Sequence, residues 1–262
     1  MRKTINSMVM MMVVTAFILA TSESARASKT DSLIITSANK SYVFTNYLKD
    51  DDIKIESKAG VVTLKGTVKN ESHKSIAQDT LEGLPGVKRV QNYLKIKGKS
   101  AAEKSDEWIS ARVRSMLLFH RNVNSVKTEV QVKNGIVTLK GEATSTAQKD
   151  LTTEYAKDVL GVKNVDNQMT VSRANKTPDQ KTMGENLDDM TESIDDASIT
   201  ALVKMTLLYH RSTSARNTTV TTNQGVVQLD GKARNSAEKD LTTKLVREVR
   251  GVKSVINKMV HL

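Results

Sequence analysis

The sequence predicts an α+β fold built three times in tandem, and a repeated glycine pattern is the first observation behind this prediction. Three glycines separated by 6 and then 20 residues recur in each copy, and together they account for nine of the 12 glycines. The copies are offset by 75 and then 90 residues, so additional residues fall between the copies and never inside this block. Self-similarity at fixed spacing indicates a repeated structural unit. The glycines expected to have structural roles are Gly60, Gly66, Gly86, Gly135, Gly141, Gly161, Gly225, Gly231 and Gly251.

Hydrophobic periodicity, the second observation, predicts a helix at the start of the later copies. In the second copy, Ile109 and Val113 begin a run of apolar residues at helical spacing after Asp106, which is expected to cap the helix. The third copy repeats this pattern after Asp196. The first copy is divergent, because residues 42–46 lack the Leu-Leu-Phe/Tyr-His-Arg sequence that the other two share.

Turn and capping signals, the third observation, predict a hairpin followed by a second helix. Apolar and polar residues alternate on both sides of Asn134-Gly135, where glycine permits a positive φ without a Cβ clash. Ser145 with Gln148 resembles a capping box, so the second helix is expected to begin there and to end at Gly161. Asn235 with Glu238 and then Gly251 mark the same helix in the third copy.

A third strand completes each copy and gives the order αββαβ. In the second copy this strand is expected over residues 162–171, with Val165, Met169 and Val171 on one face. A sheet this small is stable only if both helices cover the same face, because a second face would need its own core. We therefore predict a three-stranded sheet with two helices on one face, in three tandem domains.

Domain boundaries follow from the repeats and from the composition between them. Residues 173–194 contain Pro178, Gly184 and five acidic against three basic residues, which is typical of a flexible spacer. The predicted organisation is a signal peptide over residues 1–27, domains over 33–97, 106–172 and 195–262, a short linker over 98–105 and an acidic linker over 173–194.

The N-terminal segment has the features of a secretory signal. Arg2 and Lys3 precede an uncharged run of 13 residues, from Met8 to Ala20, which is too short for a bilayer span of about 20 residues. Ala25-Arg26-Ala27 has the small-x-small pattern of a cleavage site, so cleavage is expected after Ala27. No later apolar stretch is long enough to cross a membrane. An exported chain without a transmembrane span is therefore expected, and an N-terminal membrane anchor is the alternative.

The glycine spacing and two short motifs carry a resemblance to a known family. Each copy has Gly-[Val/Ile]-Val-x-Leu-x-Gly around its second strand and Gly-Val-Lys-x-Val-x-Asn after its second helix. This pattern resembles the BON domain, which is found in osmotically inducible periplasmic proteins, some secretins and envelope lipoproteins. The resemblance implies a non-catalytic periplasmic module, part of an osmotic or envelope stress response, that attaches to phospholipid surfaces or envelope partners.

Residues that could carry catalysis do not form a recognisable pattern. Cysteine is absent, and only the histidines at positions 120 and 210 recur, each followed by Arg but by no carboxylate at triad or metal-ligand spacing. Both histidines are expected to stabilise the end of a helix, with a pH sensor or phosphate contact as the alternative. Asp50-Asp51-Asp52 is interpreted as a solvated turn rather than a cation site. No enzyme activity, cofactor or metal is predicted.

Two sets of residues are candidates for binding. Several apolar and basic residues of the first helices lie away from the expected core face, and they could contact either a neighbouring unit or an anionic membrane. Lysines that recur at one position of each copy could add weak multivalent contacts, or could serve only solubility. The candidates are Trp108, Arg112, Leu118, Phe119, Arg121, Met205, Leu208, Tyr209 and Arg211, with Lys74, Lys149 and Lys239.

Net charge favours an anionic partner. The whole chain carries +11, and the signal segment contributes +2, which leaves +9. The first predicted domain carries 11 basic and 7 acidic residues, the second 9 and 8, and the third 11 and 6. The first and third domains therefore hold most of the excess positive charge. An exported chain with 3% aromatic residues is a poor candidate for nucleic-acid binding.

The leading hypothesis is therefore a periplasmic stress protein that binds anionic phospholipid surfaces. A holdase-type chaperone or an envelope protein-interaction module is the alternative, because the same apolar helix face could cover unfolded or folded protein partners. A potassium sensor is a third and weaker possibility.

Overall fold

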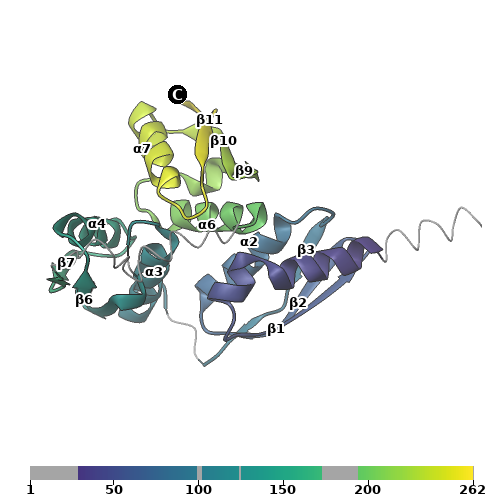
Figure 1. Cartoon of the computed structure of the whole chain (residues 1–262), viewed down its shortest axis with the longest axis horizontal. Helices are drawn as coiled ribbons and strands as arrows, with labels where there is room; N and C mark the ends of the chain where they lie inside the picture. The colour runs from purple at the N-terminus through teal and green to yellow at the C-terminus, as the bar shows by residue number, and fades with distance from the viewer. Residues whose placement is uncertain (1–28, 99–101, 124, 173–193, 262) are drawn as a thin grey trace, which may run out of the picture.

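The computed structural model describes residues 29–98, 102–123, 125–172 and 194–261, and these residues form three similar units (Figure 1). The predicted signal segment, and most of the predicted acidic linker, lie outside the described residues. We call residues 29–97 unit 1, 105–172 unit 2 and 194–261 unit 3. Unit 1 begins four residues before the predicted boundary at Leu33, because its first helix spans residues 29–40.

The three units contain the same elements in the same order, which confirms the predicted α+β class. After its first helix, unit 1 has η1 (Val43–Tyr47), β1 (Asp52–Lys58), β2 (Val61–Val68), α2 (Glu71–Glu82), β3 (Arg89–Asn92) and β4 (Lys95–Ile96). Unit 2 has α3 (Asp106–Phe119), η2 (Ser125–Lys127), β5 (Thr128–Lys133), β6 (Ile136–Ala143), α4 (Thr146–Lys157), β7 (Asn164–Asn167) and β8 (Thr170–Val171). Unit 3 has α6 (Asp196–Tyr209), η3 (Ala215–Asn217), β9 (Thr218–Asn223), β10 (Val226–Ala233), α7 (Ser236–Arg247), β11 (Ser254–Asn257) and β12 (Val260–His261).

Each sheet is mixed, with the second strand of the unit at its centre. In unit 1, β2 pairs antiparallel with β1 and parallel with β3 and β4. The parallel pairing needs a crossover, which α2 provides. Val62, Leu64 and Val68 of β2 are buried on the face that the helices cover, whereas Lys65 is exposed on the opposite face. The predicted third strand is divided into two short strands in every unit.

An aspartate near the start of each first helix holds the hairpin turn of its unit. Asp106 was expected to cap α3, but the cap is Ser105, whose Oγ accepts from the N–H of Trp108 at 3.3 Å. The Asp106 carboxylate instead accepts from the N–H groups of Asn134 and Gly135, at 2.7 and 2.8 Å. Asp195 likewise replaces Asp196 as the cap of α6. The same turn contacts are made by Asp31 to Ala59 and Gly60, and by Asp196 to Gln224 and Gly225.

The middle glycine of each triplet is required by a close backbone approach. A Cβ on Gly66 would lie 2.0 Å from the carbonyl oxygen of Asp52, far inside van der Waals contact. Its φ of 117° also lies in a region that other residues rarely adopt. Gly141 and Gly231 would place a Cβ 1.9 Å from the corresponding oxygens. The repeated glycine spacing therefore reflects the geometry of the hairpin.

The second helices end earlier than predicted. α4 ends at Lys157 and α7 at Arg247, before the glycines at 161 and 251 that were expected to terminate them. In unit 1, α2 ends at the equivalent residue, Glu82, four residues before Gly86, so the early end is common to all three units. In units 2 and 3 the residues that follow the helix form isolated β-bridges with another unit. These bridges pair Val159 with His210 and Val249 with His120.

The last strand of unit 2 agrees only in part with its prediction. Met169 is buried and Val165 packs against the core, as expected for the inner face. Val171 belongs to the short strand β8 and is 36% exposed, because it lies past the region that the helices cover. Between them, Asn167 donates through Nδ2 to the carbonyl oxygen of Lys149 at 2.9 Å and ties the strand to α4.

The three units meet through their helices, and the sheets lie toward the periphery (Figure 1). Helices α2, α3 and α6 contact one another in all three pairings. α6 is central: 11 of its 14 residues are buried, on all sides of the helix. A helix that is apolar all round requires partners on every side, which the neighbouring units supply. We call the region formed by these three helices, by η1 and by the residues that follow α3, α4, α6 and α7 the helix hub.

Candidate functional site

The Leu-Leu-Phe/Tyr-His-Arg motifs of units 2 and 3 form the seam between these units. Residues 119–121, at the end of α3, exchange backbone hydrogen bonds with residues 248–250, which follow α7. Residues 209–211, at the end of α6, do the same with residues 158–160, which follow α4. The four N–H···O distances are 3.0 Å for Arg121 to Glu248, 3.0 Å for Arg250 to Phe119, 2.9 Å for Arg211 to Asp158 and 3.1 Å for Leu160 to Tyr209. The seam therefore has approximate two-fold symmetry.

The arginines of the two motifs also bind carbonyl groups across the seam. Arg121 donates through Nη2 to the carbonyl oxygens of Val249 and Val252, at 2.9 and 2.5 Å. Arg211 makes the equivalent contacts to residues 159 and 162, at 3.4 and 3.2 Å. Both arginines satisfy carbonyl groups in the turn after the second helix of the other unit. Both arginines therefore have a structural role, although Arg121 is only half-buried and Arg211 is exposed.

The two histidines of the seam have different surroundings. His120 is fully buried and stacks on Tyr155, with ring centroids 3.9 Å apart. Burial, together with the nearby His210, lowers the pKa of His120 to about 3. Unit 3 has Leu245 where unit 2 has Tyr155, and the Nε2 of His210 instead lies 3.4 Å from the carboxylate of Asp158. That contact holds the pKa of Asp158 below its ordinary value.

An aromatic chain joins all three units inside the hub. The rings of Tyr47 and Phe119 have centroids 5.7 Å apart, and those of Phe119 and Tyr209 have centroids 6.5 Å apart. Tyr47 also donates through its hydroxyl to the carbonyl oxygen of Leu118 at 3.3 Å. Phe119, Tyr209 and Met205 are at most 3% exposed. Phe119 and Tyr209 therefore pack against neighbouring units, which was the alternative to membrane contact, and Met205 is buried in α6. Their burial also removes much of the apolar helix surface that a chaperone would use.

The remaining first-helix candidates line two clefts beside the hub. Arg112 lies between aromatic faces, with its guanidinium carbon 3.8 Å from the ring centre of Trp108 and 4.3 Å from that of Tyr209. Trp108, Arg112 and the 41% exposed Leu208 border a cleft of about 220 Å³ to which all three units contribute. Leu118 borders a wider cleft of about 720 Å³ between units 1 and 2. Trp108, Arg112 and Leu118 are half-buried.

The three recurring lysines lie at one position of the second helices and have structural contacts. The backbone carbonyl groups of Lys74, Lys149 and Lys239 each accept from an asparagine of the following strand, at 3.1, 2.9 and 3.0 Å. Lys149 also donates through Nζ to the carbonyl oxygen of Met169 at 2.6 Å. The contacts shared by the three positions involve the backbone and do not require lysine, and each side chain remains half-exposed.

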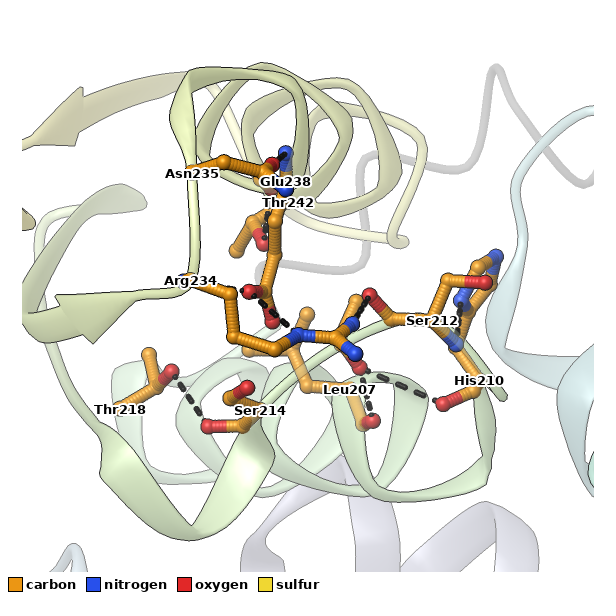
Figure 2. A network of polar contacts seen from close by, with 10 residues as sticks. Leu207, His210, Ser212, Ser214, Thr218, Arg234, Asn235, Glu238 and Thr242 are labelled. Carbon is orange, nitrogen blue, oxygen red and sulfur yellow. Dashed lines mark hydrogen bonds and ion pairs between the residues drawn. The ribbon is translucent and has the colours of Figure 1, made fainter. Parts of the chain in front are cut away.

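The carboxylate of Glu238, at the start of α7, is buried, which the sequence pattern did not predict (Figure 2). Glu238 is 4% exposed and accepts from the backbone N–H and the Nε of Arg234, at 2.7 and 3.0 Å. Burial acts to raise its pKa, but hydrogen bonds from Arg234 and Ser214 hold the pKa of Glu238 below its ordinary value. Arg234 continues to the carbonyl oxygen of Ser212, so the network fastens α7 to the loop after α6. Units 1 and 2 have His73 and Gln148 at this position.

Acidic residues before β1 stabilise a turn. Asp51 accepts from the N–H of Lys69 at 2.8 Å and contacts His73, and Asp50 pairs with the Lys69 ammonium at 2.9 Å. Within the described ranges, no group of three or more His, Cys, Asp or Glu side chains could hold a metal ion. None of the helices in this part of the chain is long and apolar enough to cross a membrane.

Comparison with known proteins identifies the family. A model of the BON domain matches residues 30–98, 105–173 and 195–261, one match in each unit. The chain belongs to the BON-domain family. The resemblance predicted from the glycine spacing is thereby confirmed, and so is the tandem arrangement of three domains.

Two curated relatives share BON-type sequence with this chain. Osmotically-inducible protein Y of Escherichia coli is 32% identical over 152 residues, which are 58% of this chain and 70% of the relative. Outer membrane lipoprotein DolP of Haemophilus influenzae is 33% identical over 125 residues, which are 45% of this chain and 64% of the relative. This BON-domain chain is thus related to an osmotically inducible protein and to an outer membrane lipoprotein.

A solved structure also matches, but only weakly as a whole. It is the C-terminal domain of CdsD, the structural protein of the Type III secretion system of Chlamydia trachomatis, with 16% identity and a TM-score of 0.23. The match covers 84% of this chain and 95% of the other. A superposition at that score does not bear on how the BON units are arranged.

Proposed function

We propose that this chain is a non-enzymatic periplasmic protein of an osmotic or envelope stress response, and that its BON domains bind anionic phospholipid surfaces. The observation that carries the proposal is the family relationship, because one relative is an outer membrane lipoprotein and the other is osmotically inducible. The signal-like segment over residues 1–27, with cleavage expected after Ala27, supports export to the compartment that this role requires.

Charge supports the choice of an anionic surface. The net charge of residues 28–262 is +9, the difference between +11 for the chain and +2 for residues 1–27. Each basic residue held close to an anionic leaflet contributes about 1 kcal/mol to binding. Several weak contacts in three linked domains would add to one another if the domains engage the surface together. The predicted binding residues that keep accessible surface for such contacts are Trp108, Arg112, Leu118, Arg121, Leu208 and Arg211, with the three recurring lysines.

Vesicle flotation tests this proposal directly. The mature chain is mixed with phosphatidylglycerol vesicles or with neutral phosphatidylcholine vesicles, at low and at high ionic strength. We expect the protein to float with the anionic vesicles at low ionic strength, and salt to weaken this binding because it screens exposed charges. Absence of binding to phosphatidylglycerol at low ionic strength would overturn the proposal.

A further inference from the structure

The outer face of the unit 1 sheet, on the side opposite the helices, points to solvent. Along β1, Ile53 and Ile55 point to the helices and pack against the core, so the residues that alternate with them point to solvent. Along β3 and β4, Asn92 bonds to α2 and Leu94 is buried, so the alternating residues are again outside. The helices cover only the inner face. No core contact therefore dictates the residue types of the outer face.

Basic residues dominate this outer face. The solvent-facing cations of the three strands are Lys54, Lys58, Lys65, Arg89 and Lys95, and the solvent-facing acids are Asp52 and Glu56. Glu56 is already neutralised locally, because Lys65 and Lys54 lie 2.8 and 3.3 Å from its carboxylate. These contacts, the Lys65 hydrogen bond first, hold the pKa of Glu56 below its ordinary value. The face as a whole therefore keeps a positive excess.

An exposed tyrosine lies between the last two strands of the same face. Tyr93 is 60% exposed, the highest value among the large apolar residues of the described chain. Its backbone is fixed, because its N–H donates to the carbonyl oxygen of Leu64 at 2.9 Å and the neighbouring Leu94 is buried. Tyrosine has an apolar ring and a polar tip, and it is enriched where membranes meet water. The outer face of unit 1 thus presents an interfacial aromatic residue among cations.

The same positions in the other units show that the basic face is specific to unit 1. The corresponding outer face of unit 2 has acidic residues at positions 129, 142 and 166 and lysines at 127, 133 and 140, so its charges balance. The residues equivalent to Lys54, Tyr93 and Lys95 are Glu129, Gln168 and Thr170 in unit 2. In unit 3, the charged residues of the corresponding outer face are two lysines, Lys232 and Lys258, and one aspartate, Asp230. Three copies of one scaffold therefore carry three different outer faces.

We propose that the outer sheet face of unit 1, centred on Tyr93 and its surrounding lysines, is the surface that contacts the anionic membrane. This inference rests on the proposed function and names the site for it. The positive excess of the face matches the charge of an anionic leaflet. The first helices of units 2 and 3, α3 and α6, in contrast, are buried in the hub or line its clefts. The face would lie on the headgroups, with the tyrosine ring at the level of the interface.

Residue exchange between the repeats tests the site with built-in controls. The variant Lys54→Glu, Tyr93→Gln, Lys95→Thr gives unit 1 the residues that unit 2 has at these positions, and it removes three units of positive charge. The control variant Lys133→Asn, Lys140→Asp gives unit 2 the residues of unit 3 and removes the same charge. We expect the first variant to bind phosphatidylglycerol vesicles at least about tenfold more weakly than the natural chain at low ionic strength. The control should change binding less than about twofold.

A reverse exchange keeps the test valid if the first variant is poorly folded. Glu129→Lys, Gln168→Tyr, Thr170→Lys places the unit 1 residues on the unit 2 scaffold, and it should strengthen vesicle binding. Equal weakening in the two charge-matched variants would overturn the inference, because binding would then depend on total charge alone. Unchanged binding in the Lys54, Tyr93, Lys95 variant would also overturn it but would leave the proposed function standing. A natural chain that does not bind phosphatidylglycerol at all would instead refute the proposed function.

Discussion

The helix hub and the outer sheet faces obey different constraints, although both are built from the same three repeats. In the hub, α6 is buried on all sides, and the seam uses matching motifs from units 2 and 3. On the outer faces, equivalent positions carry Lys54, Glu129 and Thr219 in the three units. Packing against neighbours fixes the residue types of the hub, whereas solvent leaves the outer faces free to differ. A specific partner should therefore be sought at the surfaces where the units differ, rather than at their shared core.

Removal of an aromatic ring should lower the stability of the fold strongly in the hub and only slightly on an outer sheet face. Phe119→Ala removes a side chain that is 3% exposed and contacts the rings of Tyr47 and Tyr209, so it should lower the free energy of unfolding by about 3–5 kcal/mol. Tyr93→Ala, the matched change on a 60% exposed ring, should change it by less than about 0.5 kcal/mol. Urea denaturation measures both, and similar losses would erase the distinction between the regions.

The two arginines of the seam should differ in their contribution to stability. Arg121→Ala removes contacts at 2.9 and 2.5 Å. The carbonyl of Val249 keeps the N–H of Val252 as a donor at 3.3 Å, whereas that of Val252 loses the guanidinium, so a loss of about 1–3 kcal/mol is expected. Arg211→Ala removes longer contacts, at 3.4 and 3.2 Å, and should cost less. Urea denaturation of the two variants side by side checks the order. A larger loss of stability from Arg211→Ala than from Arg121→Ala would contradict this expectation.

Acid should weaken the hub through His120. Its pKa is about 3 in the folded chain against 6.5 for the ordinary value, so the unfolded chain binds the proton first as the pH falls. The stability is complete above pH 6.5 and is lost progressively towards pH 3. Between pH 7 and pH 5 the loss should be about 1–2 kcal/mol. His120→Phe keeps a ring against Tyr155 and should remove this part of the pH dependence of urea unfolding. An unchanged pH profile in that variant would contradict the assignment.

Small effects on stability are also expected for charge exchanges confined to the outer faces. Lys133→Asn with Lys140→Asp, and Lys54→Glu with Lys95→Thr, alter exposed side chains on solvent-facing positions. Each pair should change the free energy of unfolding by less than about 1 kcal/mol, because exposed charges contribute little to stability. Thermal and urea unfolding of both pairs checks this. A large loss from either pair would show that these faces have a structural role after all.

The element order was predictable from the sequence because local signals repeat. Glycine spacing, periodicity and capping residues recur in register, and each copy supports the interpretation of the others. The turn contacts of Asp31, Asp106 and Asp196 were missed, although these residues recur at the same 75 and 90 residue offsets as the glycines. That recurrence was the signal that could have found them.

The arrangement of the units was not predictable in the same way. The extra apolar side of the first helices indicated that a partner is needed, but periodicity does not say whether that partner is lipid or another unit. The β-bridges between His120 and Val249 and between Val159 and His210 join residues that are far apart in the sequence. Such contacts arise from tertiary packing, and no local pattern encodes them.

The fluorescence of single tryptophans measures most directly which region touches the membrane. The natural chain has one tryptophan, Trp108 on α3, and the variant Tyr93→Trp, Trp108→Phe moves it to the outer face of unit 1. With brominated phosphatidylglycerol vesicles, we expect strong quenching in the variant and little quenching in the natural chain. Quenching of the tryptophan on α3 alone would contradict this expectation and would assign membrane contact to the first helices instead.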